Sequence, residues 1–198
     1  MITARVVSMI FTPFYLPTLG MLLLFVFSYL SLLPASYKII VLAIVYFFTI
    51  LLPTLLIYSY RTHQRWTSWE LGWRERRMVP YVISILCYFT CVYVMRRLHM
   101  PHFMSGIVIV ALIIQMVCAI INVWWKISTH TAGVGGVTGA LMAFSAIFYF
   151  NPLSWLCIIV LVAGFLGSSR MILRQHSLAQ VVAGFLVGCF CGLLILYV

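Results

Sequence analysis

Two short polar stretches interrupt the long apolar runs of this chain and contain the residues best suited to chemistry. The first, KISTHTAGVGG, begins at Lys126 and contains Ser128 and His130. The second, SSRMILRQHSLAQ, contains Arg170 and His176. Cationic side chains, imidazoles and hydroxyls suit the binding of an anion, and phosphate is the commonest such anion in biology. We therefore examine phosphate chemistry first.

Carboxylates are nearly absent from the chain. It has two glutamates, Glu70 and Glu75, and no aspartate. Hard cations such as Mg²⁺ prefer carboxylate oxygens, so this composition excludes enzymes that hold magnesium through a cluster of aspartates. It also excludes acid–base catalysis by a pair of carboxylates. We expect no metal and no other cofactor, and any chemistry must use His, Arg, Lys, Ser and backbone amides.

Each polar stretch precedes an apolar run and is expected to lie at the start of a helix. Ser128 or Thr129 could cap the first of these helices. His176 and Gln180 are four residues apart, so on a helix they would share a face and could hydrogen-bond. Two helix N-termini with free N–H groups at the same membrane face would form an anion-binding site.

At these residues the chain resembles the type 2 phosphatidic-acid phosphatases, the superfamily of lipid phosphate phosphatases that shares a core with vanadium haloperoxidases. The third motif of this family is Ser-Arg, five residues, His, three residues, Asp. The chain has Ser169-Arg170 followed at the same spacing by His176, and Gln180 replaces the final aspartate. The second motif, Pro-Ser-Gly-His, corresponds to residues 127–130, ISTH, which keep the serine and the histidine.

The first motif of the family, Lys, six residues, Arg-Pro, is absent as written. The nearest candidate is the segment RRMVP, in which Arg77 would take the place of the motif arginine. The pair Arg96-Arg97 is a rival, but the alternation of loops places it at the other membrane face. The resemblance covers roughly residues 74–185.

The resemblance implies a hydrolysis without metal. His176 would attack phosphorus and form a phosphohistidine, which divides one difficult step into two. His130 would protonate the leaving oxygen and later activate water. Gln180 would take the place of the aspartate that orients the nucleophilic histidine.

The same resemblance implies a set of phosphate-binding residues. Arg170 and Arg77 would hold phosphate oxygens, with Ser169 in the same motif, and Ser128 would donate its hydroxyl. Groups of this kind, positioned in advance, stabilise the charge that spreads over the equatorial oxygens in the transition state. Lys126 does not belong to the family motif, and its position suggests a further phosphate contact. It could equally be a lysine that extends toward the interface beside two tryptophans.

Composition predicts the elements that must position these residues. The chain is 65% hydrophobic and only 7% charged, whereas soluble domains are about a quarter charged. Its apolar runs have the length of a membrane-spanning helix, and in lipid only a helix satisfies the backbone of such a run. We expect a single all-α domain, residues 1–198, folded as a polytopic membrane helical bundle of six to seven spans, with the first run retained as a span. The runs are roughly 8–31, 36–60, 80–95, 102–125, 132–150, 153–167 and 177–197.

Basic residues are distributed unequally between the two membrane faces. With seven spans, the face of the two polar stretches holds nine of the 12 Lys and Arg residues, and the other face holds Lys38, Arg96 and Arg97. This excess could follow from the positive-inside rule, which would make the rich face cytoplasmic. It could instead reflect an anion site at that face, so charge alone does not orient the chain.

Two further patterns concern the surroundings of the site. Gly135 and Gly139 are four residues apart, as are the glycines of GFLVGCFCG, residues 184–192, and such spacing allows helices to approach closely in lipid. The helices that carry the two histidines are therefore expected to pack together. The segment RWTSWELGW, residues 65–73, reads as a short interfacial helix, which could also cover the site.

The sequence thus predicts a membrane phosphatase that acts on a lipid phosphate or diphosphate, with membrane lipids as partners and no nucleic acid. A catalytically weak or inactive relative that binds lipid-phosphate headgroups is the alternative, motivated by Gln180. A transporter or channel would place polar residues deep inside the spans, which is not the pattern seen. The resemblance favours the outer face of a bacterial inner membrane, against the charge distribution.

Overall fold

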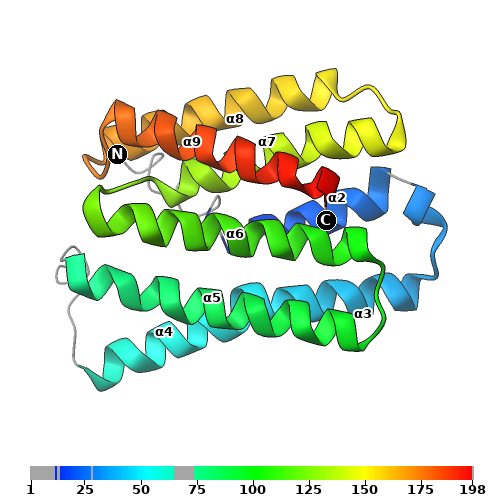
Figure 1. Cartoon of the computed structure of the whole chain (residues 1–198), viewed down its shortest axis with the longest axis horizontal. Helices are drawn as coiled ribbons and strands as arrows, with labels where there is room; N and C mark the ends of the chain where they lie inside the picture. Colours follow the sequence, from blue (N-terminus) through cyan, green and yellow to red (C-terminus); the bar gives the residue numbers. More distant parts are fainter. Residues whose placement is uncertain (1–11, 13, 28, 65–73, 198) are drawn as a thin grey trace.

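The computed structural model describes residues 12, 14–27, 29–64 and 74–197 (Figure 1). Every regular element in this part of the chain is a helix, which confirms the predicted all-α class. The elements, in chain order, are α2 (Leu16–Phe27), η1 (Tyr29–Leu32), α3 (Ala35–Tyr46), η2 (Phe47–Leu51), α4 (Leu52–His63), α5 (Arg74–Arg97), α6 (His102–Trp124), α7 (Thr129–Phe148), α8 (Leu153–Ile172), α9 (Leu178–Leu193) and η4 (Leu194–Tyr197).

Five helical stretches of the described chain are long and apolar enough to cross a membrane, as expected for an integral membrane protein. They are Ala35–His63, Met78–Arg97, His102–Trp124, Thr129–Phe148 and Leu153–Ile172. Two further apolar helices, Leu16–Val26 and Leu178–Leu193, are shorter. Each predicted apolar run therefore contains a helix, but a total of six or seven spans stays a prediction.

The helices extend beyond several of the apolar runs that predict them. α7 begins at Thr129, where the apolar run starts near residue 132, and α5 begins at Arg74, where the run starts near residue 80. Polar residues can fill the first turn of a helix because its N–H groups need hydrogen-bond acceptors. The apolar runs consequently underestimate the length of each helix, because they leave out its polar first turn.

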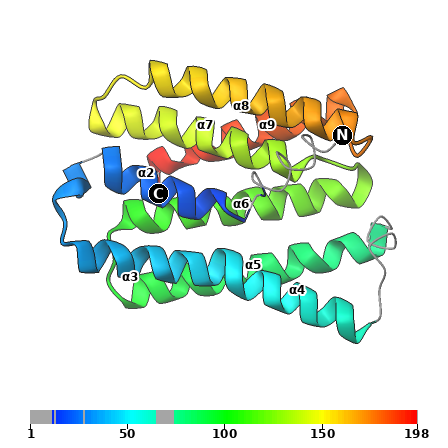
Figure 2. The same ribbon diagram turned by 180° about the vertical axis from the view of Figure 1, so that it is seen from behind.

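The two polar stretches lie at the same end of the bundle, as the alternation of loops predicts. Figure 1 shows the α6–α7 and α8–α9 connections at this end, together with the end of α4 and the start of α5. The α5–α6 and α7–α8 connections lie at the opposite end, which Figure 2 shows from behind. We call the end that carries the polar stretches the site end.

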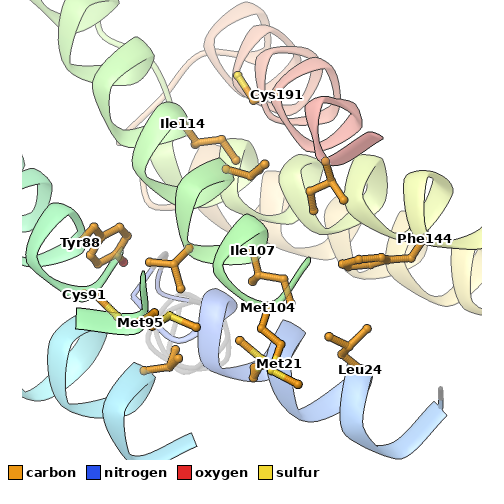
Figure 3. Close-up of a cluster of buried hydrophobic side chains, with 14 of the residues drawn as sticks. Met21, Leu24, Tyr88, Cys91, Met95, Met104, Ile107, Ile114, Phe144 and Cys191 are labelled. Carbon is orange, nitrogen blue, oxygen red and sulfur yellow. The ribbon is translucent and has the colours of Figure 1, made fainter. Parts of the chain in front are cut away.

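The apolar core is centred on α6, which lies between the α3–α5 side of the bundle and the α7–α9 side (Figure 1, Figure 2). In Figure 3, Met104, Ile107 and Ile114 of α6 meet buried side chains such as Met21 of α2 and Tyr88 of α5. In α6, 56% of the most apolar stretch of the helix is buried, whereas in α8 the corresponding share is 17%. α8 therefore presents most of its surface outward.

α7 and α9 pack with their backbones in direct contact, which confirms the close approach predicted from the glycine spacing. A Cβ atom added to Gly188 would fall on the carbonyl oxygen of Ala132, and one added to Gly135 would fall on that of Phe185. Gly139 meets the carbonyl oxygen of Cys189 in the same way. Small residues permit this approach, and close packing drives helix association in lipid.

We expect Gly188→Ala to destabilise the protein, because its methyl group would displace the backbone of α7. Overpacking of this kind costs about 1–3 kcal/mol, which exceeds the gain of up to about 1 kcal/mol that alanine brings to a helix. Thermal unfolding of the purified protein measures the difference. Gly164→Ala in α8 is the matched control, because an added Cβ there has no neighbour within 4 Å. Equal melting temperatures for the two variants would contradict the packing.

Candidate active site

The first polar stretch is organised by Ser128, which is the N-cap of α7. Its Oγ accepts a hydrogen bond from the Thr131 N–H at 3.5 Å, and the Thr131 hydroxyl donates to the Ser128 carbonyl at 3.1 Å. Of the two predicted caps, Ser128 and Thr129, the structure uses Ser128. The Ser128 side chain is fully buried, so its hydroxyl serves the helix start.

The second polar stretch begins with a sharp end to α8. The Gln175 N–H donates to the Arg170 carbonyl at 3.1 Å, and the Arg174 N–H donates to the Met171 carbonyl at 2.9 Å. This pair of bonds is a Schellman motif, with Arg174 in the left-handed position at φ 52°. The motif reverses the chain within a few residues and sets the position from which His176 leads into α9.

α9 begins with a capping box formed by Ser177 and Gln180. The Gln180 N–H donates to Ser177 Oγ at 3.4 Å, and the Ser177 N–H donates to Gln180 Oε1 at 3.1 Å. The pattern Ser-x-x-Gln is a recognised signal for this cap. The sequence carries this signal in SLAQ, residues 177–180, although the predicted role of Gln180 rested on its spacing from His176 alone.

His176 contacts Gln180, as predicted, with 3.3 Å between Nδ1 and Oε1. The predicted reason was wrong, because His176 precedes α9 and does not share a helical face with Gln180. The capping box turns the amide oxygen toward the ring instead. Because this oxygen is already the acceptor for the Ser177 N–H, it can pair only with a protonated Nδ1. This contact therefore favours a proton on Nδ1.

The two polar stretches meet through their backbones. The Ser128 N–H donates to the Gln180 carbonyl at 3.4 Å, and a Cβ added to Gly184 would lie 2.5 Å from the Ser128 carbonyl oxygen. The start of α9 thus lies against the start of α7. Ser128 and Gln180 are in direct contact, and His176 joins them through Gln180.

The remaining candidates occupy several positions near this junction. His130, Lys126 and Arg170 are half-buried, in the first turn of α7, in the connection before it and in the last turn of α8. Ser169 is buried, and its hydroxyl donates to the Phe165 carbonyl at 2.8 Å within its own helix. Ser169 is therefore engaged in the backbone of α8, whereas the basic groups are partly accessible.

The two candidates for the arginine of the first motif lie at opposite ends of the bundle. Arg77 lies in the first turn of α5 at the site end, and its side chain is outside the described residues. The rival Arg97 lies at the opposite end, where its Nε donates to the Tyr93 hydroxyl at 3.0 Å. Residues 65–73, which contain the predicted interfacial tryptophans, are also outside the described residues.

No protein-family model matches this chain, and no match is found among the curated proteins or the solved structures compared with it. The resemblance to the type 2 phosphatidic-acid phosphatases therefore rests on the motif residues and stays a prediction. Among the described residues, no three His, Cys, Asp or Glu side chains come together in a way that could hold a metal ion.

We expect Arg174→Gly to stabilise the protein by about 0.5–1 kcal/mol, because glycine adopts the left-handed conformation without the Cβ penalty. His99→Gly is a matched comparison, since His99 has φ 53° and the Met100 N–H donates to the Met95 carbonyl at 3.1 Å in the same motif at the opposite end. Melting temperatures of both variants test this. A loss of stability in Arg174→Gly alone would mean that the Arg174 side chain contributes more than its backbone costs.

Proposed function

We propose that this protein is a membrane-embedded phosphatase that hydrolyses a lipid phosphate or diphosphate without a metal ion. The observation that carries the proposal is the junction of the two polar stretches, where the Ser128 N–H donates to the Gln180 carbonyl. This bond connects the turns that carry His130 and His176, which come from segments more than forty residues apart. Both turns are helix starts, where free N–H groups favour a bound anion.

The geometry around His176 supports its proposed role as the nucleophile. The acceptor contact with Gln180 favours a proton on Nδ1, and Nε2 would be the atom that attacks phosphorus. A phosphohistidine would form as the bond from phosphorus to the leaving oxygen breaks, and water would then hydrolyse it. His130 would supply the proton to the leaving oxygen and take one from that water.

The half-buried cations support binding of the phosphate group. Arg170 and Lys126 belong to the segments that flank the junction, and Arg77 lies in the first turn of α5, which starts at the same end. Partial burial strengthens an interaction between a guanidinium and a phosphate, because less water screens the charges. Ser128 and Ser169 are engaged in helix hydrogen bonds, so we assign them mainly to positioning.

A second candidate function is binding of lipid-phosphate headgroups without turnover. The capping box favours this candidate, because it gives Gln180 a structural role. That role would preserve a glutamine at this position even in a protein without catalytic activity. The resemblance favours the outer face of a bacterial inner membrane for either function, whereas the basic site end favours the cytoplasmic face.

Release of inorganic phosphate from a panel of lipid phosphates, in the presence of a strong chelator, tests the proposed function. The wild-type protein should release phosphate and be inhibited by vanadate, and His176→Ala should abolish release because no covalent intermediate can form. His130→Ala should slow substrates with poor leaving groups by about 10²–10⁴-fold and spare those with good ones. Activity that requires added magnesium, or that survives in His176→Ala, would sink the mechanism.

Gln180→Glu should raise turnover by roughly tenfold, equivalent to about 1.4 kcal/mol, because a carboxylate of the same length keeps the capping contact and supports positive charge on His176. The carboxylate also favours the protonated ring, so the acid limb of the pH–rate profile should move to higher pH. Gln175→Glu is the matched control, because it adds the same charge to the same turn at an exposed residue. If both variants respond alike, Gln180 is not the orienting partner.

A further inference from the structure

A partly open apolar cavity of about 240 Å³ is lined mainly by α2, α6, α7 and α8, with single residues from α5 and η4. Its wall along α7 includes Gly133, Val137, Ala140 and Phe144, which recur at helical spacing on one side of that helix. Figure 3 shows Phe144 near Ile107 of α6 and Leu24 of α2, and all three residues line the cavity. The proposed chemistry above does not use this cavity.

The two ends of the cavity differ in character. At the site end its wall includes Thr129, the residue between Ser128 and His130 in the first polar stretch. At the opposite end it is bounded by aromatic rings, among them Phe144 and Phe148, which stack with their centroids 5.6 Å apart. From Thr129 to Phe144, α7 rises about 22 Å at 1.5 Å per residue. The cavity therefore leads from the candidate active site into the apolar interior.

The dimensions of the cavity select its occupant. A helix is about 10 Å across with its side chains and does not fit. A cavity of about 150 Å³ accommodates benzene, so 240 Å³ corresponds to roughly ten carbon atoms. That is a segment of one hydrocarbon chain, whereas two chains side by side would need about twice the volume.

The charge at the site end indicates which kind of molecule would carry this hydrocarbon chain. The protein has a net charge of +10, and Lys126, Arg170 and Arg174 lie at the turns of the site end. An amphiphile with an anionic head would place that head among these groups and its chain along α7. An uncharged hydrocarbon would gain nothing from these charges.

We propose that this cavity holds one hydrocarbon chain of an anionic lipid whose phosphate head lies at the junction of the two polar stretches. The inference rests on the proposed function and narrows its substrate to a phosphate from which a single chain, about ten carbons of it enclosed, enters the protein. The small residues Gly133 and Ala140 leave space along this path, and aromatic rings line its far end.

Photo-crosslinking tests the cavity without requiring turnover. The full-length protein in lipid nanodiscs is labelled with a decyl phosphate that carries a diazirine at the chain end, and the adducts are mapped by mass spectrometry. Val137→Phe should lower adducts on the cavity residues by about fivefold or more, because overpacking one side chain costs at least about 1 kcal/mol. Val160→Phe, the same change at an exposed position of α8, should leave them unchanged.

Phe144→Ala provides a test of opposite sign, which remains informative if Val137→Phe does not fold. It removes the ring at the far end, about 22 Å along α7 from Thr129, so chain-end adducts near residue 144 from an eighteen-carbon probe should increase relative to those from the ten-carbon probe. Adducts confined to outward-facing residues such as Leu161, or equal yields in the two valine variants, would overturn the inference. Cavity labelling without phosphate release from any substrate would support the cavity and refute the phosphatase.

Discussion

The contact between the backbones of α7 and α9 is the interaction on which the candidate site depends. Gly135, Gly139 and Gly188 leave no room for a Cβ atom between the helices, so carbonyl groups of one helix lie against the backbone of the other. Because lipid tails are as apolar as the side chains, burial alone does not drive such an association in a membrane. Close packing supplies the attraction, and glycine is the residue that allows it.

The helix contact has a direct consequence for the polar ends of both helices. With the backbones held in register, Gly184 lies against Ser128, and the Ser128 N–H reaches the Gln180 carbonyl. The caps of α7 and α9 then determine what each polar side chain can do. The Ser128 hydroxyl accepts the capping hydrogen bond of α7, whereas the cap of α9 directs the amide oxygen of Gln180 toward His176.

α7 serves two purposes on two of its sides. One side, which includes Gly135 and Gly139, packs on α9 and sets the position of the polar turns. Another side, which includes Val137 and Ala140, borders the apolar cavity. A single helix therefore links the proposed phosphate chemistry at its N-terminus to the proposed chain-binding cavity along its length. Gly135 and Gly139 on the first side leave room for α9, and Gly133 and Ala140 on the second leave room for the cavity.

The sequence by itself determined the helical class, the site end of the bundle and the proximity of the two polar stretches. Each of these follows from local properties, namely apolar runs, loop alternation and the spacing of glycines such as Gly135 and Gly139. It also contained the capping pattern of Ser177 and Gln180. These features depend on residues a few positions apart, so periodicity and motif spacing reveal them.

Only the tertiary structure decided which groups are available and where space remains. The burial of Ser128 and the hydrogen bond from its N–H to the Gln180 carbonyl depend on how separate helices meet. The cavity needs walls from α2, α6, α7 and α8, segments that are distant in the chain. Packing is a property of several helices at once, so no periodicity within one of them can encode an empty space between them.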